Sequence, residues 1–183
     1  MEKEIITITG DLASGKSTIS KIICQKLGYT YYSNGLYFRT LAKKYNMDVT
    51  SFGEYVKMHP EIDRQIENNT EVYAKENNRV VIDARMGFYK VPDSFKIYLK
   101  VDIDVASKRA FLDEERKDTE NHKSVEAYKN DLIKRTDLEN ERYLKLYNVD
   151  RTDMSNYDLV IDTTNKSIDE VVDIIINEYK KRA

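Results

Sequence analysis

One nine-residue segment constrains this chain most: Gly10-Asp11-Leu12-Ala13-Ser14-Gly15-Lys16-Ser17-Thr18, which fits G-x-x-x-x-G-K-[ST] at every position. Residues 4–9 before it form a short segment rich in β-branched side chains, as in a buried parallel strand. After it, apolar residues recur at helical spacing from Ile19 to Leu27, and Gly28 ends the pattern. This order of strand, loop and helix predicts a loop whose backbone N–H groups surround a phosphate.

The loop also predicts a cofactor. Lys16 is expected to reach the β- and γ-phosphates of ATP as a catalytic residue, and the Ser17 hydroxyl to ligate Mg²⁺. The predicted ATP-binding residues are Gly10, Asp11, Leu12, Ala13, Ser14, Gly15, Lys16, Ser17 and Thr18. The alternative is a chance match at a loop–helix junction, which the flanking strand and helix patterns disfavour.

Composition narrows the possible partners. Lys plus Arg is 30 against 32 Asp plus Glu in 183 residues, so no overall basic field favours nucleic acid or a membrane surface. Fourteen tyrosines would allow base stacking, but no basic and aromatic stripe accompanies them. The single cysteine, Cys24, excludes an intrachain disulfide and a multi-cysteine metal site. We expect a cytoplasmic monomer that binds neither nucleic acid nor membrane.

The rest of the chain predicts alternating strands and helices. Strands are expected at 5–9, 29–32, 80–83, 95–101 and 157–161. Helices are expected at 16–27, from Ser51 with a capping box to Glu54, after Pro60, near 104–117, from Ser124 to about Tyr147, and from Ser167 with a capping box to Glu170. This alternation predicts a three-layer α/β/α P-loop NTPase fold with a five-stranded parallel sheet.

Two insertions interrupt this single domain, which spans 1–183. Phosphoryl-transfer enzymes use such insertions to bind the molecule that accepts the phosphoryl group and to form a lid. Residues 33–78, which follow the second strand, are expected to bind this acceptor. Residues from about 109 to 135, around the polar tract 118–123, are expected to form the lid.

Arginines stand at positions suited to phosphate binding. Arg39 and Arg85 follow the second and third predicted strands, where parallel sheets bind ligands. Arg109 and Arg116 lie two helical turns apart, and so do Arg135 and Arg142, so each pair shares a helix face. For both pairs the alternative is a solvated face rich in ion pairs.

Asp83 ends the third predicted strand and is expected beside the Mg²⁺ site with Ser17, or else to cap a turn. It would serve as the base if the acceptor were a hydroxyl group. Transfer to a phosphate needs no base but does need several guanidinium groups, because two mutually repelling anions must be held in line. The many arginines favour a phosphate acceptor, and His59 and His122 are expected at the surface of the insertions.

Together these residues resemble the nucleoside monophosphate kinases, and among them the short archaeal-type cytidylate kinases. The resemblance covers about residues 4–180. It rests on the P-loop, Ser33-x-Gly35-x-x-x-Arg39, Asp83-Ala84-Arg85, Arg135-x-x-x-Glu139-x-x-Arg142-Tyr143, Tyr147-Asn148-Val149-Asp150 and the strand from Tyr157 to Thr163.

The resemblance implies ATP-dependent phosphorylation of CMP or dCMP. It places Asn34, Arg39, Arg85, Arg135, Glu139 and Arg142 at the acceptor, with Arg109, Arg116 and Arg135 among the catalytic residues. The chain departs from the family's usual pattern at Ala84, where glycine is usual, and at Leu112 and Asp113, where many relatives have another lid arginine. Two alternatives stay open: a kinase for a small hydroxyl-bearing metabolite, and a nucleotide-binding regulatory module with little turnover.

Overall fold

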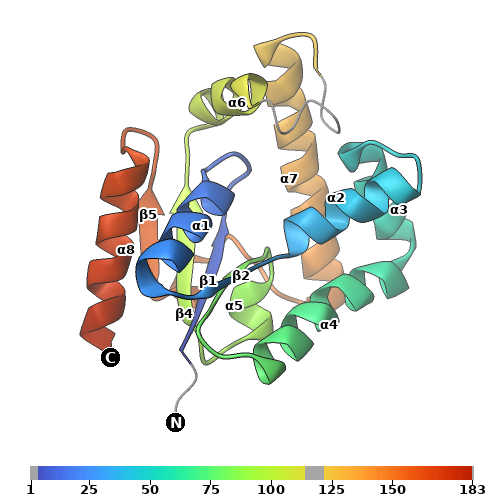
Figure 1. Cartoon of the computed structure of the whole chain (residues 1–183). Helices are drawn as coiled ribbons and strands as arrows, with labels where there is room; N and C mark the ends of the chain where they lie inside the picture. The colour runs from blue at the N-terminus through green and yellow to red at the C-terminus, as the bar shows by residue number, and fades with distance from the viewer. Residues whose placement is uncertain (1–3, 114–121, 183) are drawn as a thin grey trace.

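The computed structural model describes residues 4–113 and 122–182. A five-stranded sheet in the order β2-β3-β1-β4-β5 forms its centre, and every neighbouring pair is parallel (Figure 1). The strands are β1 (Ile5–Gly10), β2 (Thr30–Ser33), β3 (Val80–Asp83), β4 (Phe95–Lys100) and β5 (Leu159–Asp162). This confirms the predicted fold class.

The side chains of the central strand, β1, point alternately to the two faces of the sheet, and this explains the three layers. Ile6 and Ile8 of β1 pack on one face with α1 (Lys16–Leu27) and α8 (Ile168–Arg182). Ile5 points to the other face and lies in a cluster with Ala74 of α4 (Pro60–Glu76). Because successive side chains of a strand point to opposite faces, a fully buried apolar strand needs helices on both.

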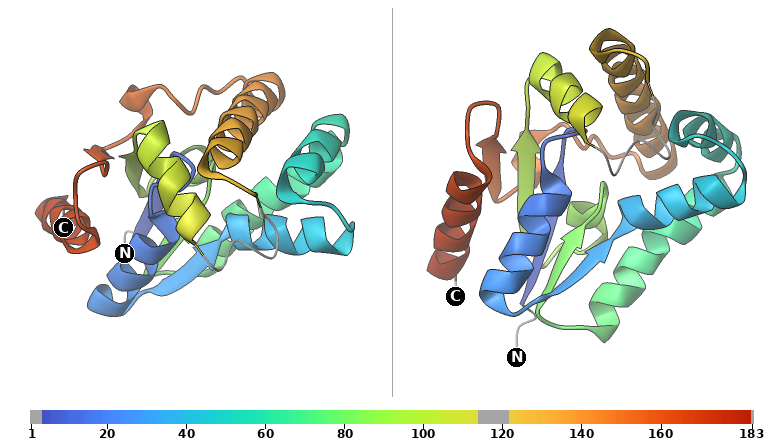
Figure 2. Two further views of the ribbon diagram at one scale, coloured as in Figure 1. Left: turned by 90° about the horizontal axis from the view of Figure 1, so that it is seen from above. Right: turned by 45° about the horizontal axis from the view of Figure 1, so that its top comes forward.

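The other helices follow individual strands of the sheet. After β2 come α2 (Asn34–Lys44), α3 (Val49–Met58) and α4; the short α5 (Gly87–Lys90) follows β3; α6 (Ile103–Leu112) and α7 (Val125–Tyr147) follow β4; and the 3₁₀ turn η2 (Met154–Asn156) precedes β5. Figure 2 shows α6, α7 and α2–α3 standing around the loop between β1 and α1. No helix in the described ranges is long and apolar enough to cross a membrane.

Several predicted element boundaries are confirmed. The first helix spans the predicted residues, α7 begins after Ser124, whose hydroxyl accepts from Ala127 N, and Ser167 and Glu170 form the expected reciprocal capping box. These boundaries depend on hydrogen bonds within one turn, which short sequence patterns encode directly.

Three boundaries differ by two residues or more. Helix α3 begins at Val49, not Ser51, because the Asp48 carboxylate caps it by accepting from Ser51 N at 2.8 Å. Helix α6 ends at Leu112 rather than near 117, since Asp113 is extended. Strand β5 begins at Leu159, two residues late, because the side chain of Asp158 accepts from Lys96 N.

Candidate functional site

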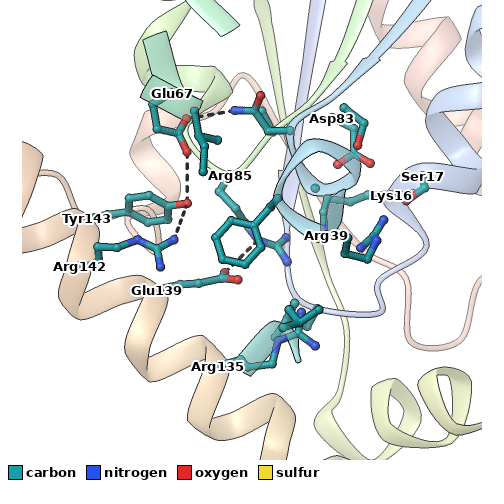
Figure 3. A pocket seen from close by; sticks show the side chains of 18 of the residues that line it. Lys16, Ser17, Arg39, Glu67, Asp83, Arg85, Arg135, Glu139, Arg142 and Tyr143 are labelled. Atoms are coloured by element: carbon teal, nitrogen blue, oxygen red, sulfur yellow. Dashed lines mark hydrogen bonds and ion pairs between the residues drawn. The ribbon is translucent and has the colours of Figure 1, made fainter. Parts of the chain in front are cut away.

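A cleft of about 750 Å³, its open mouth included, lies at the carboxyl ends of β1 and β3 (Figure 3). Its walls combine the P-loop, α2, α4, the end of β3 and α7. The lining residues are Leu12, Ala13, Lys16, Ser17, Ser33, Asn34, Gly35, Phe38, Arg39, Val49, Ile66, Glu67, Asp83, Ala84, Arg85, Arg135, Glu139, Arg142 and Tyr143.

The P-loop is fixed against β4. A Cβ at Gly10 would lie 2.4 Å from Leu99 O, so only glycine permits this close approach. The Asp11 carboxylate accepts from Tyr98 OH at 2.7 Å and from Val101 N at 2.9 Å. The side chain of Asp11 therefore anchors the loop to β4 rather than entering the cleft.

Lys16 is folded back onto its own loop. Its ammonium group donates to Gly10 O at 3.2 Å and to Asp11 O at 2.8 Å, and the residue is 9% exposed. Burial, and then the positive charge of Arg85, lower the pKa of Lys16 well below its usual value. An anion in the loop would offset both the cost of burying the ammonium group and its repulsion by Arg85. This favours phosphate binding here.

Ser17 and Asp83 line the cleft beside Lys16 (Figure 3). The Asp83 carboxylate accepts from Tyr31 OH at 3.1 Å, and burial followed by the charge of Asp83 raises the pKa of Tyr31 to about 12. A hydroxyl and a carboxylate are oxygen ligands of the kind Mg²⁺ prefers. Among the described residues no group of three or more His, Cys, Asp or Glu could hold a metal ion.

Arg85 crosses the middle of the cleft. Its guanidinium donates to Gly10 O at 2.9 Å and pairs with Glu139 of α7 at 2.9 Å, so it joins the P-loop to α7. Burial opposes ionisation of Glu139, but Arg85 and then Arg151 outweigh it and lower the pKa of that carboxyl to about 2. Glu139 is therefore ionised, and it offsets part of the positive charge in the cleft.

Arg142 forms a second charge pair between the two walls. It lies 2.8 Å from Asp63 of α4, and both side chains are almost completely buried. Tyr147 OH donates to the other Asp63 oxygen at 2.9 Å. This pair fixes α4 to α7 at the end of the cleft away from the P-loop.

Glu67 lies beside that pair. It accepts from Tyr143 OH at 3.3 Å and from Asn34 Nδ2 at 3.4 Å, while Asn34 also donates to Thr70 Oγ1 at 2.6 Å. Burial, and then repulsion by Asp63, raise the pKa of Glu67 to about 8. Two glutamates facing one cleft are thus held in opposite protonation states at neutral pH.

The structure brings most of the predicted site residues together. All six predicted acceptor residues line the cleft, as do Lys16, Ser17 and Asp83. Arg109 does not: its guanidinium donates to Thr163 O at 2.8 Å and Thr164 O at 3.3 Å, in the loop after β5. Arg116 lies outside the described residues.

Sequence reasoning missed Glu67, Tyr143 as its partner, and Arg151, which is 1% exposed and lies 3.9 Å from Glu139. One signal was present for Glu67. Asp63, Glu67 and Thr70 recur at i, i+4 and i+7, a polar stripe on the buried face of α4.

Comparisons with known proteins agree on the family. The model of the cytidylate kinase-like family matches residues 5–165. A cytidylate kinase of Methanocaldococcus jannaschii is 35% identical over 97% of this chain and 99% of its own length, and one of Sulfolobus acidocaldarius is 33% identical over 97% and 94%. An S-adenosylmethionine-dependent nucleotide dehydratase of Lacinutrix mariniflava is 34% identical over 98% of this chain, which spans 36% of that protein's length.

Solved structures agree on the fold. A shikimate kinase of Bacteroides thetaiotaomicron has a TM-score of 0.63 at 14% identity, covering 97% of this chain and 98% of its own. A gluconokinase of Sinorhizobium meliloti has a TM-score of 0.63 at 13% identity, covering 100% and 94%. At such identities the similarity concerns the arrangement of helices and strands.

Proposed function

The chain belongs to the cytidylate kinase-like family and is a phosphotransferase, and we propose that it transfers the γ-phosphoryl group of ATP to a nucleoside monophosphate, with CMP and dCMP as the preferred acceptors. The observation that carries this proposal is the order of groups along the cleft. The P-loop with Lys16 stands at one end with Arg39 beside it, Arg85 crosses the middle, and Arg142 lies at the opposite end (Figure 3). Such spacing suits two phosphates held in line.

The residues divide the work of this reaction. Lys16 and the P-loop N–H groups hold the donor phosphates, and Arg39 and Arg85 hold the acceptor phosphate. Arg135 of α7 completes the set of positive charges around the transferring group. Bound Mg²⁺, held through Ser17 and Asp83, would neutralise charge on the β- and γ-phosphates. Arg109 and Arg116 would act as lid arginines, and Arg109 must first leave its carbonyl partners in the loop after β5.

The position of Asp83 favours a phosphate acceptor over a hydroxyl acceptor. Its carboxylate lies beside Lys16 and Ser17, on the donor side of Arg85 (Figure 3), and it already accepts from Tyr31 OH. A base for a hydroxyl acceptor would have to face the α4–α7 wall, within hydrogen-bond reach of the acceptor. Asp83 is better placed to hold a metal ion.

An ADP-release assay tests the proposal. The protein is supplied with Mg-ATP and, separately, CMP, dCMP, UMP, AMP and GMP, and the products are identified by chromatography. We expect the highest kcat/KM with CMP or dCMP. No turnover with any of the five monophosphates, or phosphorylation of a metabolite that carries only hydroxyl groups, would overturn the proposal.

A further inference from the structure

The end of the cleft away from the P-loop carries a buried carboxyl that the proposed transfer of the phosphoryl group does not use. Glu67 is 2% exposed, lines the cleft from α4, and faces Tyr143 and Arg142 of α7 (Figure 3). Apolar side chains line the same cleft: Phe38, over which the Arg142 guanidinium lies at 5.8 Å, and Ile66. A flat ring bounded by such side chains would meet the Glu67 carboxyl at its edge.

The charged groups around Glu67 leave it without a counter-ion of its own. On its own helix, Asp63 is already paired with Arg142 of α7. Tyr143 and Tyr147 of α7 and Tyr32 of β2 all have raised pKa values, chiefly through burial, so they stay neutral over the physiological range. Lys90 of α5 contributes a more distant positive charge and donates to Asn68. The surroundings therefore favour the protonated carboxyl.

A protonated Glu67 has a hydrogen to donate, and the two hydrogen bonds that the structure gives to its carboxyl oxygens both come from donors. The Tyr143 hydroxyl receives a hydrogen bond from Arg142 Nη2 at 3.3 Å and directs its own hydrogen to Glu67 Oε1. Asn34 approaches Oε2 through its amide nitrogen, which is also a donor. Both contacts deliver hydrogens to Glu67, so its own O–H is available to a ligand in the cleft.

We propose that neutral Glu67 binds the base of the acceptor nucleotide, pairing its O–H and its carbonyl oxygen with an acceptor and a donor that lie side by side on the edge of the ring. The inference rests on the proposed function, which puts the acceptor phosphate at Arg39 and Arg85 and so directs the base toward the α4–α7 wall. Cytosine offers this pattern in its ring N3 acceptor and its exocyclic amino donor. An ionised carboxylate has no hydrogen to donate, so one of the two bonds becomes a repulsion between lone pairs.

The proposal predicts a pH effect on acceptor binding. We expect the KM for CMP of the wild-type protein to rise about tenfold between pH 7 and pH 9, because the binding-competent neutral form of a group with a pKa near 8 falls by that factor. The KM for ATP should change much less. Glu67→Gln keeps a donor and an acceptor but cannot ionise, so its KM for CMP should stay within about threefold of the wild-type value at pH 7 and lose the rise at pH 9.

Two further variants separate binding from structure. Glu67→Ala should raise the KM for CMP at least tenfold at pH 7. Glu71→Gln is the matched control: Glu71 lies one turn further along α4, is partly exposed and pairs with Lys75, so this variant should keep the wild-type pH profile. Thermal unfolding at pH 8.5 checks the fold, and Glu67→Gln should unfold at a higher temperature than the wild type because it removes a buried ionisable group.

Two outcomes overturn the inference, and they differ. If the wild type phosphorylates CMP and Glu67→Gln retains the wild-type rise in KM between pH 7 and pH 9, Glu67 does not bind the base although the proposed function stands. If no nucleoside monophosphate is phosphorylated, the proposed function fails and the inference fails with it.

Discussion

The two ends of the cleft are built in different ways. At the end proposed to hold the donor phosphates, here called the donor end, one continuous segment forms the P-loop. Lys16 is the only charged residue of that segment that is both buried and in the lining of the cleft. At the acceptor end, charges from separate elements are paired across the gap: Arg85 after β3 with Glu139 of α7, and Asp63 of α4 with Arg142 of α7. The donor end depends on backbone geometry, and the acceptor end on side chains compensating one another.

This difference predicts how each end responds to the loss of a single side-chain group. Removing one group from the donor end removes a contact with the ligand but leaves the protein's own charges in place. Removing one partner at the acceptor end leaves a buried charge without compensation, which costs about 3–5 kcal/mol in general. We therefore expect donor-end variants to fail in catalysis and acceptor-end variants to fail in stability as well.

Lys16→Ala gives the largest expected effect. We predict that kcat falls about a thousandfold or more, since the charge on the transferring phosphoryl group loses its main protein partner. The unfolding temperature should stay close to that of the wild type, and CMP binding should remain measurable by calorimetry. Lys26→Ala, on the same helix but exposed and paired with Asp173, serves as the control. An active Lys16→Ala protein would contradict the P-loop role.

Glu139→Gln tests the acceptor end. The pKa of Glu139 is about 2 when folded and ordinarily near 4.5, so its ionised form stabilises the fold above pH 4.5, and this stability is lost as the pH falls toward 2. We predict that the variant loses about 3 kcal/mol of unfolding free energy at pH 7 and much less at pH 3. Urea unfolding at both pH values measures this. An equal loss at both would show that the charge of Glu139 is not what stabilises the wall.

Asp83→Asn sharpens the assignment of the donor end. As a ligand of Mg²⁺, Asp83 should be replaceable in part, so we predict about a tenfold loss of kcat/KM that high Mg²⁺ concentrations reduce. A catalytic base for a hydroxyl acceptor would instead cost several hundredfold or more, with no rescue by Mg²⁺. Titration of activity against Mg²⁺ distinguishes the two roles.

Ala84→Gly gives the smallest expected effect. Ala84 is buried beside Val80 and Ile82, and its φ lies outside the left-handed region. Restoring the family's usual glycine should cost about 1 kcal/mol of stability through the lost methyl contact and the added chain freedom, with less than a threefold change in kcat/KM for CMP. A larger change in acceptor preference would show that the Ala84 methyl group selects the acceptor.

The donor end was predictable from the sequence because its determinants are local. The glycines of the P-loop and the helix after it act within a few positions of one another, as do the capping residues of α7 and α8 elsewhere in the fold. Even local signals compete, however: Asp48 and Ser51 both suit the cap of α3, and the carboxylate of Asp48 takes the position.

The acceptor end was predictable only in part. Arg39, Arg85, Arg135 and Arg142 were identified because they follow strands or share a helix face. Glu139, which pairs with Arg85, was also identified, but Asp63 and Glu67 were not, because they stand in a helix that contains many polar residues. Their burial results from α4 packing beside α7, an arrangement between segments about 80 residues apart, as the Tyr147–Asp63 hydrogen bond shows.

The sheet register lets the segment between β2 and β3 vary in length. Ser33, at the end of β2, lies directly beside Asp83, at the end of β3, and Thr30 lies beside Val80. The chain thus leaves the sheet and returns to it on adjacent strands, with α2, α3 and α4 in between. Lengthening such an excursion adds only a small closure entropy, about 0.6 kcal/mol for each doubling of a flexible loop. The length of this segment can therefore change without disturbing the sheet or the P-loop, provided that Asp63 stays opposite Arg142.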